Sequence, residues 1–304
     1  MNLQYVKYAL EISRTGSISK AAENLSVAQP NLSRAVKELE SQLGISIFER
    51  TRTGMTVTPE GEKLLSAGER ILREVGELET MFSGEALPRE SLSVMAAPSA
   101  YLAHAFISFC ASLPEDAIYE TRYSEGDLTE ALDAVVSGAV KLGIVRIPVH
   151  FEKYYTDKLT AKELKHETVA EFSPVILAGL GSSLAGKDTV TPVALGELCQ
   201  VASPESLPLE GSRGDAAVTK EITVTDRATA YALLVGDPTL CVAAPPMPAF
   251  LAAQLGLVQR PCFDTTLYRD LLICRKDYRL TATDEAFLRA LKGTARAVKD
   301  RAFS

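Results

Sequence analysis

The sequence contains few of the residues from which metal sites and catalytic triads are built. It has no tryptophan and three histidines, His104, His150 and His166, which lie far apart and without the spacing of metal ligands. A histidine that would serve as the base of a serine–histidine–aspartate triad is not indicated either. We therefore expect no enzyme activity, no bound metal and no cofactor.

Cysteine and long apolar runs are also scarce. The five cysteines include no C-x-x-C pair, and most of them lie in apolar runs such as Leu240–Val242. We interpret them as small buried residues, with a redox switch as the alternative. No run reaches about 18 apolar residues, and the N-terminus has no charged stretch followed by an apolar run. Because these features are absent, we expect no disulfide framework and no membrane span. We expect a cytoplasmic protein. The cysteines are Cys110, Cys199, Cys241, Cys262 and Cys274.

Positive charge is scarce as well. The 304 residues carry 32 Lys and Arg against 39 Asp and Glu, for a formal net charge of −7. A general nucleic-acid coat protein is therefore excluded, because non-specific affinity comes mainly from neutralised phosphates. Residues 1–60 hold seven basic against six acidic residues, and they are the only net-positive part of the chain. Any binding to nucleic acid is expected to be local and specific.

Residues 17–43 carry two short amphipathic helices joined by a polar turn. At about 100° per residue, the second helix separates an apolar face from a polar face. The apolar face consists of Leu32, Ala35, Val36, Leu39 and Leu43. The polar face consists of Pro30, Ser33, Arg34, Lys37 and Ser41. Pro30 suits a first helical turn and Gly44 suits a helix end. Such a second helix is what a helix-turn-helix offers to the DNA major groove.

Other features of the N-terminal region support a small helical core. Ser17 is placed to cap the first helix of the pair, and a preceding helix is expected over residues 3–13. Leu25 and Val27 are expected to point into the core. The alternative interpretation is a helical subdomain that serves packing alone. The next segment favours DNA binding, because residues 47–50 and 55–58 read as two strands around a turn that contains Gly54.

This turn is expected to be the wing of a winged helix. Its arginines, Arg50 and Arg52, suit phosphate contacts or insertion into a narrow minor groove. A long helix follows, with Thr58 as its cap, and is expected to run to Phe82. Its apolar residues recur at steps of 4 and 3, as in a coiled coil, although they could instead pack on their own domain. These residues are Leu64, Gly68, Ile71, Val75, Leu78 and Phe82.

The N-terminal region closely resembles the LysR-type transcriptional regulators of bacteria. The resemblance rests on residues 19–22 with Leu25, residues 29–33, Leu39-Glu40, Leu43-Gly44, residues 48–50 and residues 58–61. It is strong over about the first 65 residues and continues more weakly to the C-terminus. The resemblance implies base contacts by Gln29, Pro30, Asn31, Ser33, Arg34 and Lys37. It also implies wing contacts by Arg50, Arg52 and Thr53.

From residue 91 onward, strands and helices alternate, which predicts α/β structure. The expected strands are residues 92–96, 117–123, 142–147, 172–180, 200–202, 221–224, 240–244 and 267–274. The expected helices are residues 99–113, 129–137, 193–198, 226–235, 248–255 and 283–298. Pro88-Arg89-Glu90 is the expected hinge into this region.

The resemblance implies three parts in order along the chain. Residues 1–58 form the winged helix-turn-helix, residues 59–87 the linker helix that dimerises, and residues 91–304 a two-lobed α/β effector domain like a periplasmic binding protein. The first lobe would comprise residues 91–161 and 267–304, and the second lobe residues 162–266. Assembly into a homodimer or homotetramer is implied as well.

In open α/β lobes, ligands lie beyond the carboxyl ends of strands, where helix N-termini offer unpaired N–H groups. Ser99, with the amides of Ala100 and Tyr101, is therefore expected to hold a small anion such as a carboxylate. Arg146 ends a predicted strand, and it either faces the cleft as a carboxylate partner or is an ordinary surface arginine. Weaker candidates for effector contacts are Ser124, Leu128, Thr129, Ser203 and Thr225.

One segment imitates a phosphate-binding loop. Residues 181–187 match the spacing G-x-x-x-x-G-K. The next residue is Asp188 rather than Ser or Thr, and Pro192 interrupts the helix that would have to follow. We interpret the segment as a surface loop. The sequence thus predicts an effector-responsive DNA-binding regulator. The alternatives are an architectural DNA-binding protein without effector, and a solute-binding or catalytic α/β protein whose helical head only dimerises.

Overall fold

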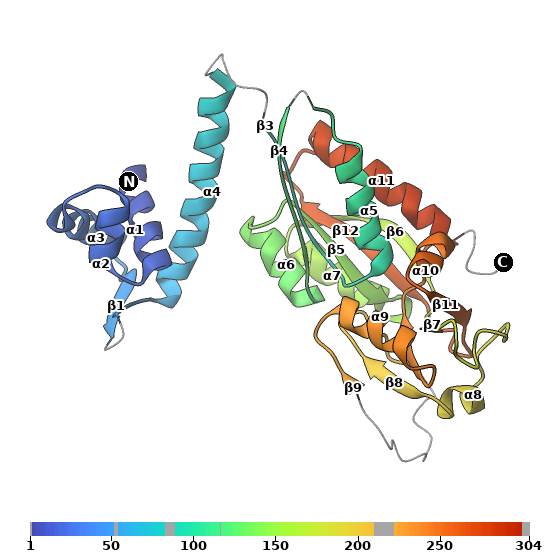
Figure 1. Cartoon of the computed structure of the whole chain (residues 1–304). Coiled ribbons are helices and arrows are strands. Elements are labelled where there is room, and N and C mark those ends of the chain that lie inside the picture. Colours follow the sequence, from blue (N-terminus) through green and yellow to red (C-terminus); the bar gives the residue numbers. More distant parts are fainter. Residues whose placement is uncertain (1, 52–53, 83–88, 116, 210–221, 300–304) are drawn as a thin grey trace. The chain divides into compact units, whose positions relative to one another are not determined.

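The computed structural model describes residues 2–51, 54–82, 89–115, 117–209 and 222–299 (Figure 1). These residues form two compact units, one of essentially residues 2–89 and the other of essentially residues 90–299. Among the described residues, no helix combines the length and the apolar character needed to cross a membrane.

The first unit is a winged helix. Its elements are α1 (Leu3–Thr15), α2 (Ile18–Asn24), α3 (Gln29–Leu43), β1 (Phe48–Thr51), β2 (Gly54–Val57) and α4 (Pro59–Phe82). The predicted caps are confirmed: the Ser17 hydroxyl accepts a hydrogen bond from the amide of Lys20, and Gly44 ends α3 in the left-handed conformation. Thr58 Oγ1 accepts the amide of Gly61 at 2.9 Å. The Ser17 and Thr58 side chains satisfy N–H groups that the first turns of α2 and α4 leave without partners.

One hydrophobic core joins the helices of this unit to the hairpin. Leu32, Val36 and Leu39 of α3 are buried in it, as predicted from the apolar face of that helix. The side chain of Leu43, which was predicted on the same face, is 38% exposed. It belongs to the last turn of α3, where the chain leaves the core at Gly44.

Helix α4 begins by packing against its own unit. A Cβ atom added at Gly68 would lie 2.3 Å from Cγ1 of Val6, and one added at Gly61 would lie 2.3 Å from the carbonyl oxygen of Ile47. Leu64 and Leu65 pack into the same core. The coiled-coil prediction is therefore wrong for the first part of the apolar stripe, because those positions already have partners within the unit. Ile71 and Val75 are half-buried.

The second unit contains two five-stranded sheets, each of which defines a lobe. The first lobe has strand order β4-β3-β5-β12-β6, with α5 and α11 packed on one face and α6 and α7 on the other. Its strands are β3 (Arg89–Ala96), β4 (Ile118–Glu125), β5 (Leu142–Pro148), β6 (Leu164–Phe172) and β12 (Tyr268–Arg275). Its helices are α5 (Ala100–Ala111), α6 (Leu128–Ser137), η1 (Val149–Phe151), α7 (Glu152–Ala161) and α11 (Ala282–Lys299).

The second lobe has strand order β11-β7-β10-β8-β9. Strand β8 pairs in parallel with β10 and β9, whereas β7 pairs antiparallel with β10 and β11. Its strands are β7 (Val175–Gly179), β8 (Cys199–Ala202), β9 (Ile222–Thr223), β10 (Leu240–Ala244) and β11 (Leu257–Pro261). Its helices are α8 (Pro192–Gly196), α9 (Arg227–Gly236) and α10 (Ala249–Gln254). Both lobes are thus mixed sheets rather than purely parallel ones.

Three expectations for this unit require correction. Arg89 and Glu90 open strand β3 instead of forming a hinge. The strand expected over residues 172–180 corresponds to β7, whereas Phe172 is the last residue of β6, a strand that was not expected and that belongs to the other sheet. Because β6 pairs with β12 along its whole length, the chain first crosses between the lobes after Phe172 rather than near residue 162. It returns between Pro261 and Tyr268.

Candidate functional site

Helix α3 presents a polar face to solvent. Gln29, Pro30, Asn31, Arg34 and Lys37 are exposed. Ser33 is half-buried. Leu32, Ala35, Val36 and Leu39 hold the opposite face in the core, so the rotation of the helix about its own axis is set by packing. The structure therefore gathers on α3 the six residues predicted to contact bases, and five of them are exposed.

The acidic residues near this face are bound within the unit. Glu40 Oε1 accepts the amides of Ile47, at 2.7 Å, and Phe48, at 3.3 Å. Tyr5 donates its hydroxyl to Glu38 at 3.3 Å. Glu40 thereby ties the end of α3 to the strand that begins the wing, a positioning role that sequence reasoning missed. The signal was an acidic residue one turn before the end of a helix that leads into a β-hairpin.

The wing is attached to the end of helix α1. The amide of Met55 donates to the carbonyl oxygen of Gly16 at 3.0 Å. Gly54 has a φ of 132°, and a Cβ atom there would lie 2.8 Å from that same oxygen. Only glycine fits this position without strain. Arg50 lies in strand β1, opposite Met55, and Arg52 and Thr53 lie outside the described residues.

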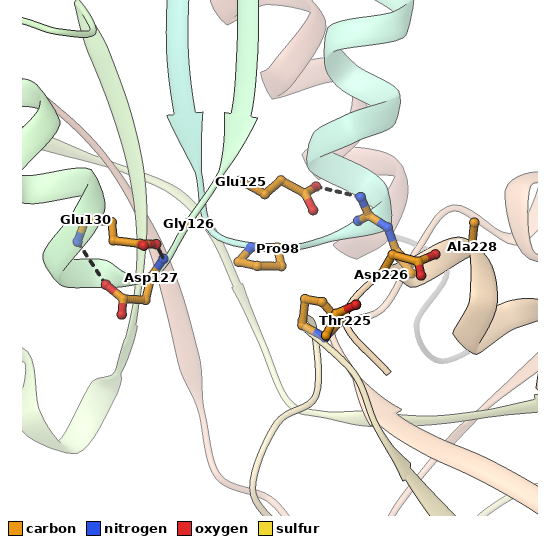
Figure 2. Close-up of a pocket in the computed structure, with 10 residues that line it drawn as sticks. Pro98, Glu125, Gly126, Asp127, Glu130, Thr225, Asp226 and Ala228 are labelled. Carbon is orange, nitrogen blue, oxygen red and sulfur yellow. Dashed lines mark hydrogen bonds and ion pairs between the residues drawn. The ribbon is translucent and has the colours of Figure 1, made fainter. Parts of the chain in front are cut away.

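The second unit contains a cleft of about 700 Å³ between its lobes (Figure 2). The first lobe contributes Pro98, Gly126 and three acidic residues, and the second lobe contributes the segment from Thr225 to Ala228 together with Pro204. The acidic residues of the first lobe are Glu125, Asp127 and Glu130. Of the residues predicted to contact an effector, Thr225 lines this cleft. The loop positions of the cleft agree with the rule that ligands lie beyond strand ends.

Ser99 lies next to the cleft, because it follows Pro98 in the chain. It is the N-cap of α5 and is fully buried, and its hydroxyl has no hydrogen-bond partner within the described part of the chain. Ala100 and Tyr101 begin the helix, and the Tyr101 hydroxyl donates to Asp270 at 2.5 Å. Burial first, and then the charge of Asp270, raise the pKa of Tyr101 well above its usual value.

The other weak candidates occupy varied positions. Ser124 lies 3.4 Å from the carbonyl oxygen of Val94 and donates to it, and the Ser203 hydroxyl lies 3.1 Å from that of Ser206. Leu128 packs against the core beneath α6, and Thr129 is exposed. Contacts of these residues with an effector remain predictions.

Arg146 is not an ordinary surface arginine, because its side chain is only 10% exposed, and its contact with an effector remains a prediction. Its Nε and Nη2 atoms donate to the two oxygens of the fully buried Asp270, both at 2.8 Å, and Nη1 donates to the carbonyl of Pro98 at 3.1 Å. Burial lowers the pKa of Arg146, but Asp270 outweighs this effect and the net pKa is raised. Two guanidinium nitrogens of Arg146 are thus already used in a bidentate pair with a carboxylate of the protein. Arg146 also holds the loop that leads to Ser99.

Arg227 connects the two lobes. Its Nη2 atom lies 2.5 Å from Glu125 Oε1 of the first lobe, and its Nη1 atom lies 3.6 Å from Glu205 Oε2 of the second. Tyr231 donates its hydroxyl to Glu205 at 2.7 Å. Burial raises the pKa of Glu205. Sequence reasoning missed this cluster. The nearest signal was the pair Asp127 and Asp226, which directly precede the observed helices α6 and α9 and are recognisable capping residues.

The two units together define a class: winged helix-turn-helix proteins that carry a two-lobed α/β unit. Residues 3–62 match the family described as "Bacterial regulatory helix-turn-helix protein, lysR family". The first unit therefore carries a helix-turn-helix of the lysR family. The regulator YcgK of Bacillus subtilis is 31% identical over 157 residues, which cover 50% of this chain and 48% of that protein. YofA of Bacillus velezensis is 33% identical over 144 residues, or 46% and 49% of the two chains. The chain spans about half the length of these curated relatives.

Solved structures agree with the fold over nearly the whole chain. Full-length OxyR from Pseudomonas aeruginosa, in a variant form, has a TM-score of 0.60 at 17% identity and covers 98% of this chain and 99% of its own. CbnR, a LysR-family transcriptional regulator, has a TM-score of 0.58 at 19% identity and covers 97% and 99%. CbnR has also been solved in complex with its target DNA, with a TM-score of 0.58. At these identities the likeness establishes the fold.

Proposed function

We propose that this chain is a sequence-specific, DNA-binding transcriptional regulator whose binding responds to a small molecule in the inter-lobe cleft. The proposal rests on the polar face of α3. This face is exposed because Leu32, Val36 and Leu39, on the opposite face of the helix, are packed in the core. Arg34 and Lys37 supply cations there, and Gln29 and Asn31 supply amide groups that can pair with base edges. CbnR, which shares the fold, binds its target DNA in this architecture.

The wing completes the proposed DNA surface. Gln29, Pro30, Asn31, Ser33, Arg34 and Lys37 would lie along the major groove. Arg50, Arg52 and Thr53 would contact the backbone or the adjacent minor groove. A regulator with such contacts would act in the cytoplasm, where a bacterial chromosome lies.

The second unit is proposed to sense the ligand and to mediate assembly. Its cleft supports sensing over a purely architectural role, because an open cavity of about 700 Å³ has the size of a small-molecule site. Exposed apolar side chains support a homodimer or homotetramer: Ile107 on α5 is 61% exposed and Val235 on α9 is 56% exposed. Ile71 and Val75 are only half-buried, so the later part of α4 is proposed to pack against a partner helix.

The proposal is tested by an electrophoretic mobility shift with DNA from upstream of the gene. We expect specific binding, and Arg34→Ala is expected to weaken it by about 1–3 kcal/mol if Arg34 contacts a base. The matched control is Arg279→Ala, which removes an exposed arginine from the second unit and should leave binding unchanged. Folded protein that ignores this DNA at low ionic strength would overturn the proposal.

A salt titration tests the wing. If Arg50 or Arg52 neutralises a phosphate, its replacement by alanine lowers the salt slope of binding by about 1. An unchanged slope would remove that residue from the proposed DNA surface.

A further inference from the structure

One arginine is shared by carboxylates of the two lobes. Arg227 begins α9 in the second lobe, and its Nη2 atom lies 2.5 Å from Oε1 of Glu125, the last residue of β4 in the first lobe. Figure 2 marks this bond with a dashed line from Glu125. The Nη1 atom faces Oε2 of Glu205, in the second lobe, at 3.6 Å, which is too long for a hydrogen bond. Glu125, Arg227 and Glu205 together form the Arg227 cluster.

Glu205 is the carboxylate of this cluster whose charge is poorly compensated. The residue is only 2% exposed, and its Oε1 atom accepts the hydroxyl of Tyr231 at 2.7 Å. Arg227 Nη1 approaches the other oxygen without bonding to it, and this Nη1 atom is itself buried with no hydrogen-bond partner in the described part of the chain. A buried carboxylate with an incomplete partner is costly as an anion, so its neutral form is favoured.

The surroundings of Glu205 act on its proton in opposite directions. Four groups that carry or can carry charge face it within the described ranges. They are Tyr231 and Arg227 on α9, Glu125 on β4 and Arg146 on β5. Behind them, Asp270 pairs with Arg146, and Tyr123 donates its hydroxyl to Glu125 at 3.1 Å. Burial has the largest effect and Glu125 adds to it, so the net pKa of Glu205 is raised, although the facing tyrosine and the two arginines lower it.

Glu205 lies in a segment of the second lobe that is packed against the first lobe. Leu207, in the same segment, packs against the core of the first lobe, and the carbonyl oxygen of Pro208 accepts the hydroxyl of Tyr268 at 3.4 Å. Pro204, on the other side of Glu205, lines the cleft. Separation of the lobes at the cleft would therefore expose Glu205 to water and remove the first-lobe groups from its surroundings.

The connections between the lobes suit such a motion. Two short segments, residues 173–174 and 262–267, join the lobes. Two lobes that are joined by a few loop residues and enclose a cavity can open and close about a hinge. Contacts across the cavity then influence the equilibrium. Of the described residues that line the cleft, Arg227 and Glu125 form the ion pair that crosses it.

We propose that the Arg227 cluster is a proton-linked latch on the inter-lobe cleft. A proton on Glu205 leaves Arg227 wholly to Glu125 and favours the closed arrangement, whereas ionised Glu205 attracts Arg227 back into the second lobe and favours the open one. The inference deepens the proposed function, on which its regulatory meaning rests, but the latch itself requires neither DNA nor an effector.

The linkage has a definite sign. Glu205 holds its proton more tightly in the closed arrangement, where it is buried, than in the open one, where water reaches it. Closing therefore takes up a proton. It is favoured below the ordinary pKa of a glutamate, about 4.3, and this preference is lost as the pH rises through the raised pKa of Glu205 in the closed arrangement.

The chain has no tryptophan, so a single introduced tryptophan can report on the cleft. Thr225→Trp places this reporter at an exposed position that lines the cleft. Quenching of its fluorescence by acrylamide is measured on the full-length protein between pH 4 and 8, while circular dichroism shows at which pH values the protein is folded. We expect quenching to increase as the pH rises, because the cleft opens.

Three substitutions in the reporter protein identify the groups. Glu205→Gln keeps an acceptor for Tyr231 but cannot ionise, so it should abolish the pH dependence and, at pH 8, lower the open fraction about two- to fivefold. Glu125→Gln removes the charge that pairs across the cleft and should raise the open fraction by a similar factor. Tyr231→Phe removes a hydrogen bond that favours ionised Glu205, so the midpoint of the transition should move to higher pH.

Asp127→Asn is the matched control. It removes a carboxylate that lines the same cleft but exchanges its hydrogen bonds with Glu130, and asparagine caps a helix equally well. Quenching should therefore match the reporter protein at each pH. A loss of the pH dependence in this control would show that general cleft charge, and not the Arg227 cluster, governs closing, and it would overturn the inference.

Two other results would overturn it as well: a pH dependence that persists in Glu205→Gln, or quenching at pH 8 that neither Glu205→Gln nor Glu125→Gln alters. The comparison at pH 8 needs no acid, so it decides the matter even where low pH unfolds the protein. A mobility shift on the same proteins reports the proposed regulator function separately. A working latch without DNA binding would leave the inference standing and reject the function, and DNA binding without a latch would do the reverse.

Discussion

Inside the first lobe, Arg146 donates two parallel hydrogen bonds to Asp270, from Nε and Nη2, both at 2.8 Å. The same guanidinium donates to the carbonyl of Pro98 and lies 5.1 Å over the ring of Phe172. Strands β5 and β12, which are 124 residues apart at this pair, are thereby tied to the loop in front of α5. The arginine thereby supports the loop that contains the cleft-lining Pro98.

Removing one partner of this pair is expected to be costly. Asp270→Asn leaves the buried guanidinium without its countercharge, so we expect a loss of about 3–5 kcal/mol in the free energy of unfolding, measured by urea titration. The control is Asp277→Asn at the exposed pair with Arg275, where about 1 kcal/mol or less is expected. Similar losses for the two variants would contradict the role of the buried pair.

Two glycines of α4 should respond in opposite directions to alanine. At Gly68 the new Cβ would lie 2.3 Å from the stiff, buried side chain of Val6, so Gly68→Ala is expected to destabilise the protein by about 1–3 kcal/mol. At Gly76 the added Cβ meets no atom within 4 Å, so Gly76→Ala is expected to stabilise the helix by up to about 1 kcal/mol. Thermal denaturation measures both, and Val6→Ala should partly rescue Gly68→Ala.

Glu40, which lies on α3, is expected to hold the wing in position. Glu40→Ala leaves the amides of Ile47 and Phe48 without their acceptor and should cost about 1–3 kcal/mol of stability. It should also weaken DNA binding, because the wing loses its attachment to α3. Glu40→Gln retains an acceptor oxygen and should behave almost like the unaltered protein. Equal effects of the two substitutions, measured by denaturation and mobility shift, would argue against this role.

The pH dependence of stability should reveal the buried Glu205. Burial raises its pKa in the folded state, so the folded protein holds this proton more tightly than the unfolded chain does. Glu205 therefore makes stability fall as the pH rises from its ordinary pKa of about 4.3 to its raised value. Glu205→Gln should remove this decline, which urea titrations between pH 4 and 8 can measure.

A second variant checks the cause. The hydroxyl of Tyr231 donates to Glu205 and lowers the pKa of that carboxyl, so Tyr231→Phe should steepen the decline. A slope that neither substitution alters would show that another group dominates the pH dependence.

Local elements were predictable where a segment carries its own pattern. The face of α3, its proline start and its glycine end depend on residues within a single helix, and the structure places them as expected. Strand β6 was missed because four consecutive residues after Leu164 are exposed and polar, as on the edge of a sheet. Its identity as a strand comes from hydrogen bonds to β12, about a hundred residues away in the sequence.

The amino-acid order alone was sufficient for the winged helix and for the alternation of strands and helices, because periodicity and capping act over a few residues. The position of the cleft, the pairing of Arg146 with Asp270 and the clustering of acidic side chains from both lobes arise only when distant segments pack together. Charge pairing depends on distance in space, and the spacing of these residues along the chain does not indicate that distance.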